Sequence, residues 1–129
     1  MEYPNAQKIV DAAYRTLKGK RYFDWFQSLT EVEQVCESVG RFYYQVCNGG
    51  IIQWHNNRYS ECSGTLCNSL VVLGCPEVKD IVSNFINRAN FADESDFELH
   101  TQDLDDKLND LIDDMMDKLE AYAIKRLTN

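Results

Sequence analysis

Apolar residues recur every three or four positions in five stretches of the chain, the spacing of helices that turn one face toward a core. The stretches lie at about residues 9–17, 32–46, 66–71, 78–86 and 104–127. No segment sustains the two-residue alternation of a half-buried β-strand. The pattern predicts an all-α fold, a compact multi-helix domain of about five to six helices with a long acidic C-terminal helix. The length of 129 residues suits a single α-helical domain over 1–129.

Capping residues, glycine and proline mark the expected helix ends. Thr30 followed by Glu33 is a capping box, which starts a helix. The Asn-Gly-Gly sequence at 48–50 ends that helix, because glycine adopts the left-handed conformation common at helix C-termini. The Gly-Cys-Pro sequence at 74–76 ends one helix and begins the next, since proline suits a first helical turn.

Three segments outside the periodic stretches are predicted to be connections. The aromatic segment 22–26 is expected to be a connector packed on the core, and 51–54 a short link between two helices. Residues 90–102 are polar, acidic and aperiodic, which favours a loop.

Negative charge is concentrated in the second half of the chain. The net charge is −8, but residues 1–60 carry seven Lys/Arg and six Asp/Glu, whereas residues 61–129 carry six and fifteen. Residues 93–120 hold twelve acids and two lysines. Because a nucleic-acid-binding protein needs a basic surface, we expect no direct binding to DNA or RNA.

Membrane and secretory signals are not visible in the sequence. No apolar run approaches the roughly 20 residues of a membrane span, and no basic segment followed by an apolar one opens the chain. The cysteines are odd in number, which favours reduced and mostly buried thiols and a cytoplasmic protein. They are Cys36, Cys47, Cys62, Cys67 and Cys75.

The residue types of common catalytic and metal sites occur only in incomplete patterns. Cys62, Cys67 and His55 lack the second ligand pair of a typical zinc site, so structural thiols are the favoured interpretation. A Cys–His pair is a weaker enzyme candidate, because no nucleophile motif surrounds any cysteine. Neither a glycine-rich phosphate loop nor a calcium loop is present. We expect no enzyme activity, no cofactor and no metal.

The C-terminal helix is unusually acidic. Eight acids over 18 residues span about 27 Å of helix, or one carboxylate per roughly 3.4 Å, close to the charge spacing of one DNA strand. Several acids repel one another at i,i+4, each pair costing about 0.2–0.5 kcal/mol. Two interpretations stay open on these residues alone, a face kept for solubility and a face that imitates DNA.

Residues 48–57 carry a motif with a wider resemblance. They read Asn-Gly-Gly-Ile-Ile-Gln-Trp-His-Asn-Asn, and Leu-Gly-Cys-Pro follows at 73–76. This resembles the Asn-Gly-Gly-apolar-x-Gln signature of the bacterial DNA-mimic protein family, with its apolar-Gly-Ala-Pro turn about 21 residues after the glutamine. The resemblance covers about 28–120. His55 in place of the second aromatic residue, and the segment 58–60, depart from the pattern.

The resemblance implies a helical domain with an acidic surface that imitates DNA, and a homodimer as one possible assembly. The motif itself is interpreted as structural: the glycines cap a helix, and Gln53 and Asn57 satisfy backbone groups of the turn. Its residues are Asn48, Gly49, Gly50, Gln53, Asn57, Gly74 and Pro76.

Together these patterns favour an acidic DNA mimic that occupies the DNA-binding site of a basic partner, such as a repressor, a nuclease or a defence factor, and excludes DNA. The alternative is an interaction or immunity-type protein that binds through the aromatic regions around Trp25 or Trp54. The expected partner-binding residues are acidic: Asp93, Glu94, Asp96, Glu98, Asp103, Asp105, Asp106, Asp110, Asp113, Asp114, Asp117 and Glu120.

Overall fold

The computed structural model describes residues 3–91 and 101–128, and within them it is helical without a strand. The predicted all-α fold is thereby confirmed. The elements are α1 (Pro4–Tyr14), α2 (Tyr22–Gln27), α3 (Glu31–Asn56), the 3₁₀ turn η1 (Tyr59–Cys62), α4 (Ser63–Leu73), α5 (Pro76–Phe91) and α7 (Gln102–Thr128).

Helix boundaries follow the local signals in most places. Thr30 and Glu33 form the predicted capping box of α3, with both reciprocal hydrogen bonds present. Gly74 ends α4 in the left-handed conformation, at φ 74° and ψ 42°, and Pro76 begins α5. The start of α3 and the boundary between α4 and α5 therefore lie where the sequence predicts them.

Two expected connections are helical instead. The aromatic segment 22–26 forms most of α2, and 51–54 continues α3 beyond a break at Gly49 and Gly50. Residues 90 and 91 extend α5, whereas 92–100 lie outside the described residues. Both segments are too short for a periodic pattern to show, and burial of one apolar side, such as Trp25 and Phe26 in α2, stabilises short helices of weak propensity.

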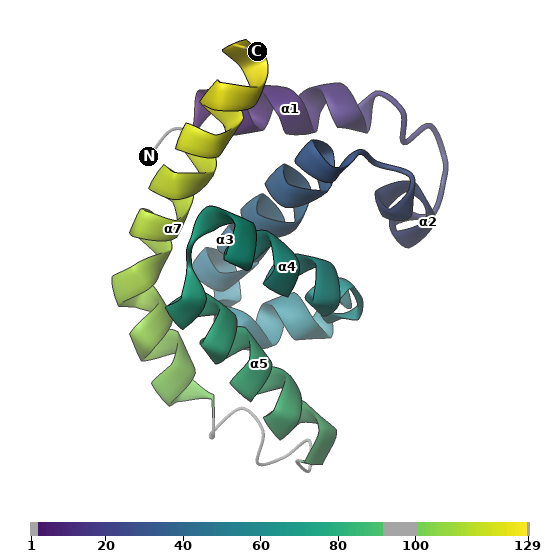
Figure 1. The fold of residues 1–129 in the computed structure, drawn as a ribbon. Coiled ribbons are helices and arrows are strands. Elements are labelled where there is room, and N and C mark those ends of the chain that lie inside the picture. Colours follow the sequence, from purple (N-terminus) through teal and green to yellow (C-terminus); the bar gives the residue numbers. More distant parts are fainter. Residues whose placement is uncertain (1–2, 92–100, 129) are drawn as a thin grey trace.

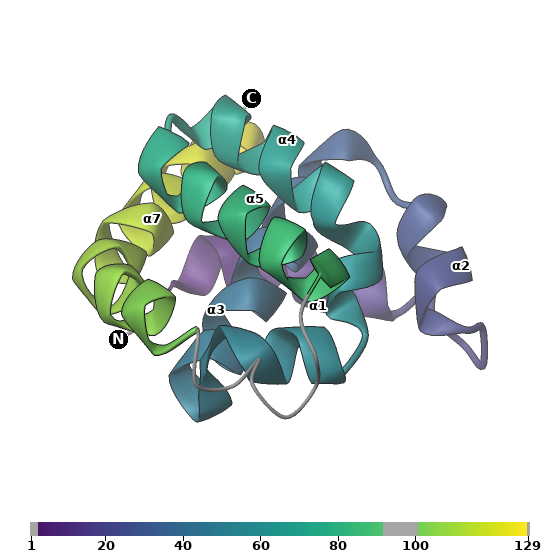
Figure 2. The same cartoon turned by 90° about the horizontal axis from the view of Figure 1, so that it is seen from below.

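α3 lies at the centre of the arrangement and contacts α1, α4 and α7. α7 runs along one side of the molecule, and α1 crosses it near its C-terminal end (Figure 1). α5 packs against both α4 and α7. Figure 2 shows α2 at the end of the molecule opposite α7. α7 thus has one side against the body and one side toward solvent.

The core is one large apolar cluster with a small second one near α2. In the large cluster Trp54 packs edge-on against Phe42, with ring centroids 5.3 Å apart. In the small cluster the Trp25 indole stacks on Tyr14 and donates a hydrogen bond to the Ala13 carbonyl oxygen at 3.2 Å. Both tryptophans are buried, with 0% and 2% of their surfaces exposed. Each tryptophan therefore belongs to the core of its apolar cluster.

The cysteines are less uniformly buried than expected. Cys36 and Cys75 are buried, Cys62 and Cys67 are partly buried, and Cys47 is exposed. All five are free thiols. Among the described residues no three His, Cys, Asp or Glu side chains gather in a group that could hold a metal ion. In the same part of the chain, none of the helices is long and apolar enough to cross a membrane.

Candidate protein-interaction surface

α7 presents an apolar side to the body and an acidic side to solvent. Leu104, Leu108, Met115 and Leu119 are fully buried on the inner side. At about 100° per residue, these positions lie opposite the acids at 106, 110, 113 and 117. The helix therefore forms because its apolar residues bury against α1, α3 and α5, and its acids are left on the outside.

Asp105 is one of two acids on α7 that cap another helix. Its Oδ1 accepts a hydrogen bond from the backbone N–H of Ile51 at 2.8 Å, 54 positions away in sequence. Ile51 begins the second part of α3, where backbone N–H groups lack helical partners. Burial raises the pKa of Asp105, although the bond from Ile51 opposes that shift. This carboxylate is a cap and is only partly available to a partner.

The two glycines of the motif make room for side chains. Gly50 has φ 79° and ψ 177°, a conformation almost restricted to glycine. A Cβ on Gly50 would also lie 2.6 Å from the Asp105 carboxylate. A Cβ on Gly49 would collide with the folded-back side chain of Gln53. The Asn-Gly-Gly sequence therefore breaks α3 and lets α7 approach the break.

Gln53 and Asn57 act differently from the prediction. Neither caps the backbone of the turn; both side-chain amides donate to Oε1 of Gln45, at 3.0 and 2.6 Å. Gln45 lies on the first part of α3, so these bonds tie the two parts of α3 together across the break. The backbone N–H of Ile51 in the turn is satisfied by Asp105 instead.

Glu120 is the second acid with a capping role. Its Oε1 accepts from the backbone N–H groups of Ala6 at 2.9 Å and Asn5 at 3.1 Å, and its Oε2 accepts from the Asn5 side chain at 2.8 Å. These N–H groups belong to the first turn of α1, whose N-cap, Tyr3, offers no side-chain cap. Burial acts to raise the pKa of Glu120, but the bonds from Ala6 and Asn5 outweigh it and hold the pKa below its usual value.

Two further acids on α7 have basic partners. Asp103 forms a bidentate ion pair with Arg88 of α5, with distances of 2.9 and 3.0 Å, and this bond lowers the pKa of Asp103. Asp114 lies 3.3 Å from Nζ of Lys118. Lys118 also donates to the carbonyl oxygen of Gly74 at 2.9 Å. α7 therefore contacts the second motif as well as the first.

Four aspartates remain, and they form one line along the helix. All four are exposed, and no ion pair to them occurs among the described residues. Their spacing of four, three and four residues places them within about 60° of one another over roughly 16 Å. We call them the aspartate stripe: Asp106, Asp110, Asp113 and Asp117.

The charge spacing of this surface differs from the spacing counted along the sequence. The aspartate stripe carries one carboxylate per about 5.5 Å of helix, against roughly one per 3.4 Å for a DNA strand. Asp103 and Asp114 are exposed beside it and add partly neutralised charge. The remaining expected acids, Asp93, Glu94, Asp96 and Glu98, lie outside the described residues.

Residues 27–127 match the family model described as DMP19-like protein. The chain belongs to the DMP19-like family. The match extends slightly beyond the expected 28–120 and includes both motifs and all of the aspartate stripe. No match was found among curated proteins or among solved structures.

In this DMP19-like chain the capping roles of two acids escaped the sequence analysis. One signal was available: α1 starts after Tyr3 and the second part of α3 starts after Gly50, and neither position carries Ser, Thr, Asp or Asn, whose short side chains cap helices. A predicted helix that lacks a capping residue needs an acceptor from elsewhere. The sequence does not say which of the many acids supplies it.

Proposed function

We propose that this protein is a non-enzymatic DNA mimic whose aspartate stripe occupies the DNA-binding site of a basic partner protein and excludes DNA. The observation that carries the proposal is the stripe itself. Like charges on one helix face repel one another, and a helix kept only for packing gains nothing from them. Membership of the DMP19-like family and the motif resemblance support the same conclusion.

The stripe is held on a rigid support. α7 is tied to α3 through Asp105, to α1 through Glu120, and to the end of α4 through Lys118. A partner that binds a pre-ordered row of charges pays little conformational entropy. Complementary charge chiefly raises the association rate, and salt weakens it. The proposed mechanism is competition for one basic surface, with no bond made or broken.

The alternative, an interaction protein that binds through the aromatic regions around Trp25 or Trp54, is less well supported. The side chains of Trp25 and Trp54 are buried in the two apolar clusters and cannot form a contact surface without unfolding. Binding through these regions would need other residues.

The experiment compares two variants that lose the same charge. The first changes the aspartate stripe to asparagine, which keeps side-chain size and relieves like-charge repulsion. The second removes four exposed acids from other helices: Asp11→Asn, Asp24→Asn, Glu77→Gln and Asp80→Asn. A partner is first captured from a lysate on the wild-type protein. The affinity of this partner for each variant is then measured over a series of salt concentrations. The measurements are repeated in the presence of the DNA that the partner binds.

We expect the stripe variant to bind the partner at least about ten-fold more weakly at low salt, with a shallower salt dependence. The reason is that exposed charges at an interface mainly raise the association rate, and that contribution is lost with the four carboxylates. The control variant should bind nearly as well as wild type. DNA should displace the wild-type protein from the partner. Unchanged affinity of a folded stripe variant, or simultaneous binding of DNA and this protein, would refute the proposal.

A further inference from the structure

A cavity of about 650 Å³ lies between α1, α3 and α7. Its volume is within the range of roughly 300–1,000 Å³ typical of small-molecule sites. Val10, Cys36, Met116 and Leu119 belong to the apolar part of its wall, and α1 and α3 also contribute polar side chains. This mixture, apolar with a few placed polar groups, is the usual composition of a ligand site.

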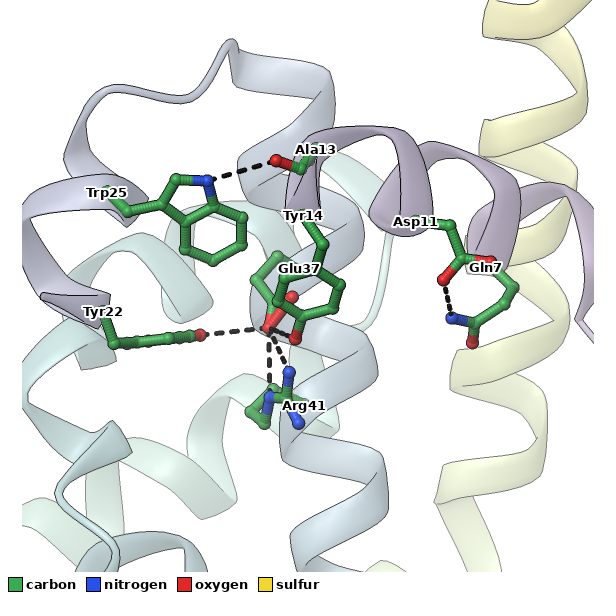
Figure 3. Close-up of polar contacts among 8 residues, drawn as sticks. All are labelled: Gln7, Asp11, Ala13, Tyr14, Tyr22, Trp25, Glu37 and Arg41. Carbon is green, nitrogen blue, oxygen red and sulfur yellow. Dashed lines mark hydrogen bonds and ion pairs between the residues drawn. The ribbon is translucent and has the colours of Figure 1, made fainter. Parts of the chain in front are cut away.

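One face of α3 supplies most of the polar wall. Glu37, Gly40, Arg41 and Tyr44 line the cavity at positions i, i+3, i+4 and i+7, which lie on one side of a helix. Glu37 is 1% exposed. Its Oε1 accepts hydrogen bonds from the hydroxyls of Tyr14 and Tyr22 and from Nε of Arg41, at 3.0, 3.1 and 3.0 Å (Figure 3).

The Arg41 guanidinium is held in place but keeps one edge free. Its Nε and Nη2 both contact Oε1 of Glu37, and it lies 5.7 and 5.5 Å from the ring centroids of Tyr14 and Tyr59. Nη1 has no hydrogen-bond partner among the described residues. Because Glu37 occupies the Nε side, the edge formed by Nη1 and the second Nη2 hydrogen remains, and that edge suits a carboxylate.

Gly40 is one of the residues of α3 that line the cavity. It lies inside α3, where glycine is a poor helix residue, and its φ is not positive. A Cβ built on Gly40 meets no atom within 4 Å. Because Gly40 lines the cavity, a larger side chain at this position would occupy part of that space.

We propose that this cavity binds a small molecule with a flat apolar body and one carboxylate, which pairs with the free edge of Arg41. The apolar body lies against Gly40 and Met116, beside the Tyr14 and Tyr44 rings. Among the residues that line the cavity, Glu37 is the acidic one, and it is paired with Arg41; Asp113 and Asp117 are not lining residues, although they act electrostatically on Tyr3. A cationic ligand would instead meet the exposed edge of the guanidinium.

The test uses 2-naphthoate as the probe and 2-naphthylmethylammonium as its cationic counterpart, titrated by calorimetry into the full chain. We expect one 2-naphthoate per chain with a dissociation constant below about 1 mM, and cation binding at least about ten-fold weaker. Methyl signals of Val10 and Met116 should shift on binding, and those of the exposed Val71 should not.

Two leucine variants separate binding from stability. Gly40→Leu fills the cavity and should weaken 2-naphthoate binding at least about ten-fold without lowering the melting temperature, since leucine favours helix. Gly64→Leu is the matched control, because Gly64 is an exposed glycine of α4 with no atom within 4 Å of its Cβ. Arg41→Lys keeps the charge but loses the planar edge, and should also weaken binding.

Three results would overturn the proposal: no saturable binding of 2-naphthoate to wild type, equal binding of the cationic probe, or a wild-type affinity in Gly40→Leu. If Gly40→Leu fails to fold, the methyl shifts of the wild-type protein decide the question. The cavity and the aspartate stripe are lined by different residues, but Asp113 and Asp117 act electrostatically on Tyr3 at the cavity wall. The stripe variant should therefore bind 2-naphthoate at least as well as wild type, whatever its affinity for a protein partner.

Discussion

Glu120 and Asp117 lie three residues apart on α7, and the structure gives them opposite roles. Glu120 caps α1 through the backbone N–H groups of Asn5 and Ala6. Asp117 is exposed and belongs to the aspartate stripe. We therefore expect Glu120→Ala to lower stability without a direct effect on the acidic surface. Asp117→Ala should leave stability intact and weaken partner binding.

The size of the Glu120 effect follows from the bonds that it loses. Removal of a capping side chain costs about 0.5–2 kcal/mol, and loss of a negative charge at a helix N-terminus costs about 0.3–1 kcal/mol. Ala6 is 4% exposed, so water does not readily replace the acceptor. We expect about 2 kcal/mol in the free energy of unfolding, or roughly 8 °C in melting temperature for a domain of this size.

The assay is urea unfolding followed by circular dichroism over a pH series. The pKa of Glu120 is lowered in the folded state, so its stabilising contribution is present above its unfolded pKa, near 4.5. It is lost as pH falls through the folded value. The difference between wild type and Glu120→Ala should be largest near neutral pH and shrink below about pH 4.

Asp117→Ala is the control for charge removal on the same helix. It removes one exposed charge, relieves repulsion from Asp113 four positions earlier, and introduces a better helix former, so stability should stay equal or rise slightly. If Glu120→Ala is as stable as Asp117→Ala near neutral pH, the capping argument is wrong.

Two other predictions concern the motif and the buried acid. Gly50→Ala should lower the free energy of unfolding by about 2–4 kcal/mol, because alanine is strained at this positive φ and its Cβ displaces the Asp105 cap. The control, Gly64→Ala, should not lower it. Both variants are measured by urea unfolding. Burial raises the pKa of Glu37 to about 7, against an opposing hydrogen bond from Tyr22. The stability that depends on Glu37 should therefore fall as pH rises from about 4.5 to 7 and then level off, and Glu37→Gln should flatten this part of the pH profile. If the dependence of stability on pH is unchanged in Glu37→Gln, a group other than Glu37 is responsible for it.

Most of the helices could be predicted because their signals are local. The capping box at Thr30, the glycine at 74 and the proline at 76 each act within one helical turn, and the apolar period of α7 persists over more than twenty residues. α2 was missed because it is only six residues long, too short for a periodic pattern, and is stabilised by the burial of Trp25 and Phe26.

The sequence by itself also determined that an acidic helix would face solvent, since α7 cannot bury its aspartates. Only the tertiary structure decided which acids are free. Asp105 and Glu120 accept from N–H groups 54 and 115 positions away in sequence. The spacing of residues within one helix cannot predict such contacts. The same holds for the cavity, which Gly40 of α3 lines together with residues of α1 and α7. Helix formation depends on neighbours within one turn, but the role of a charge or a gap depends on what the folded chain places against it.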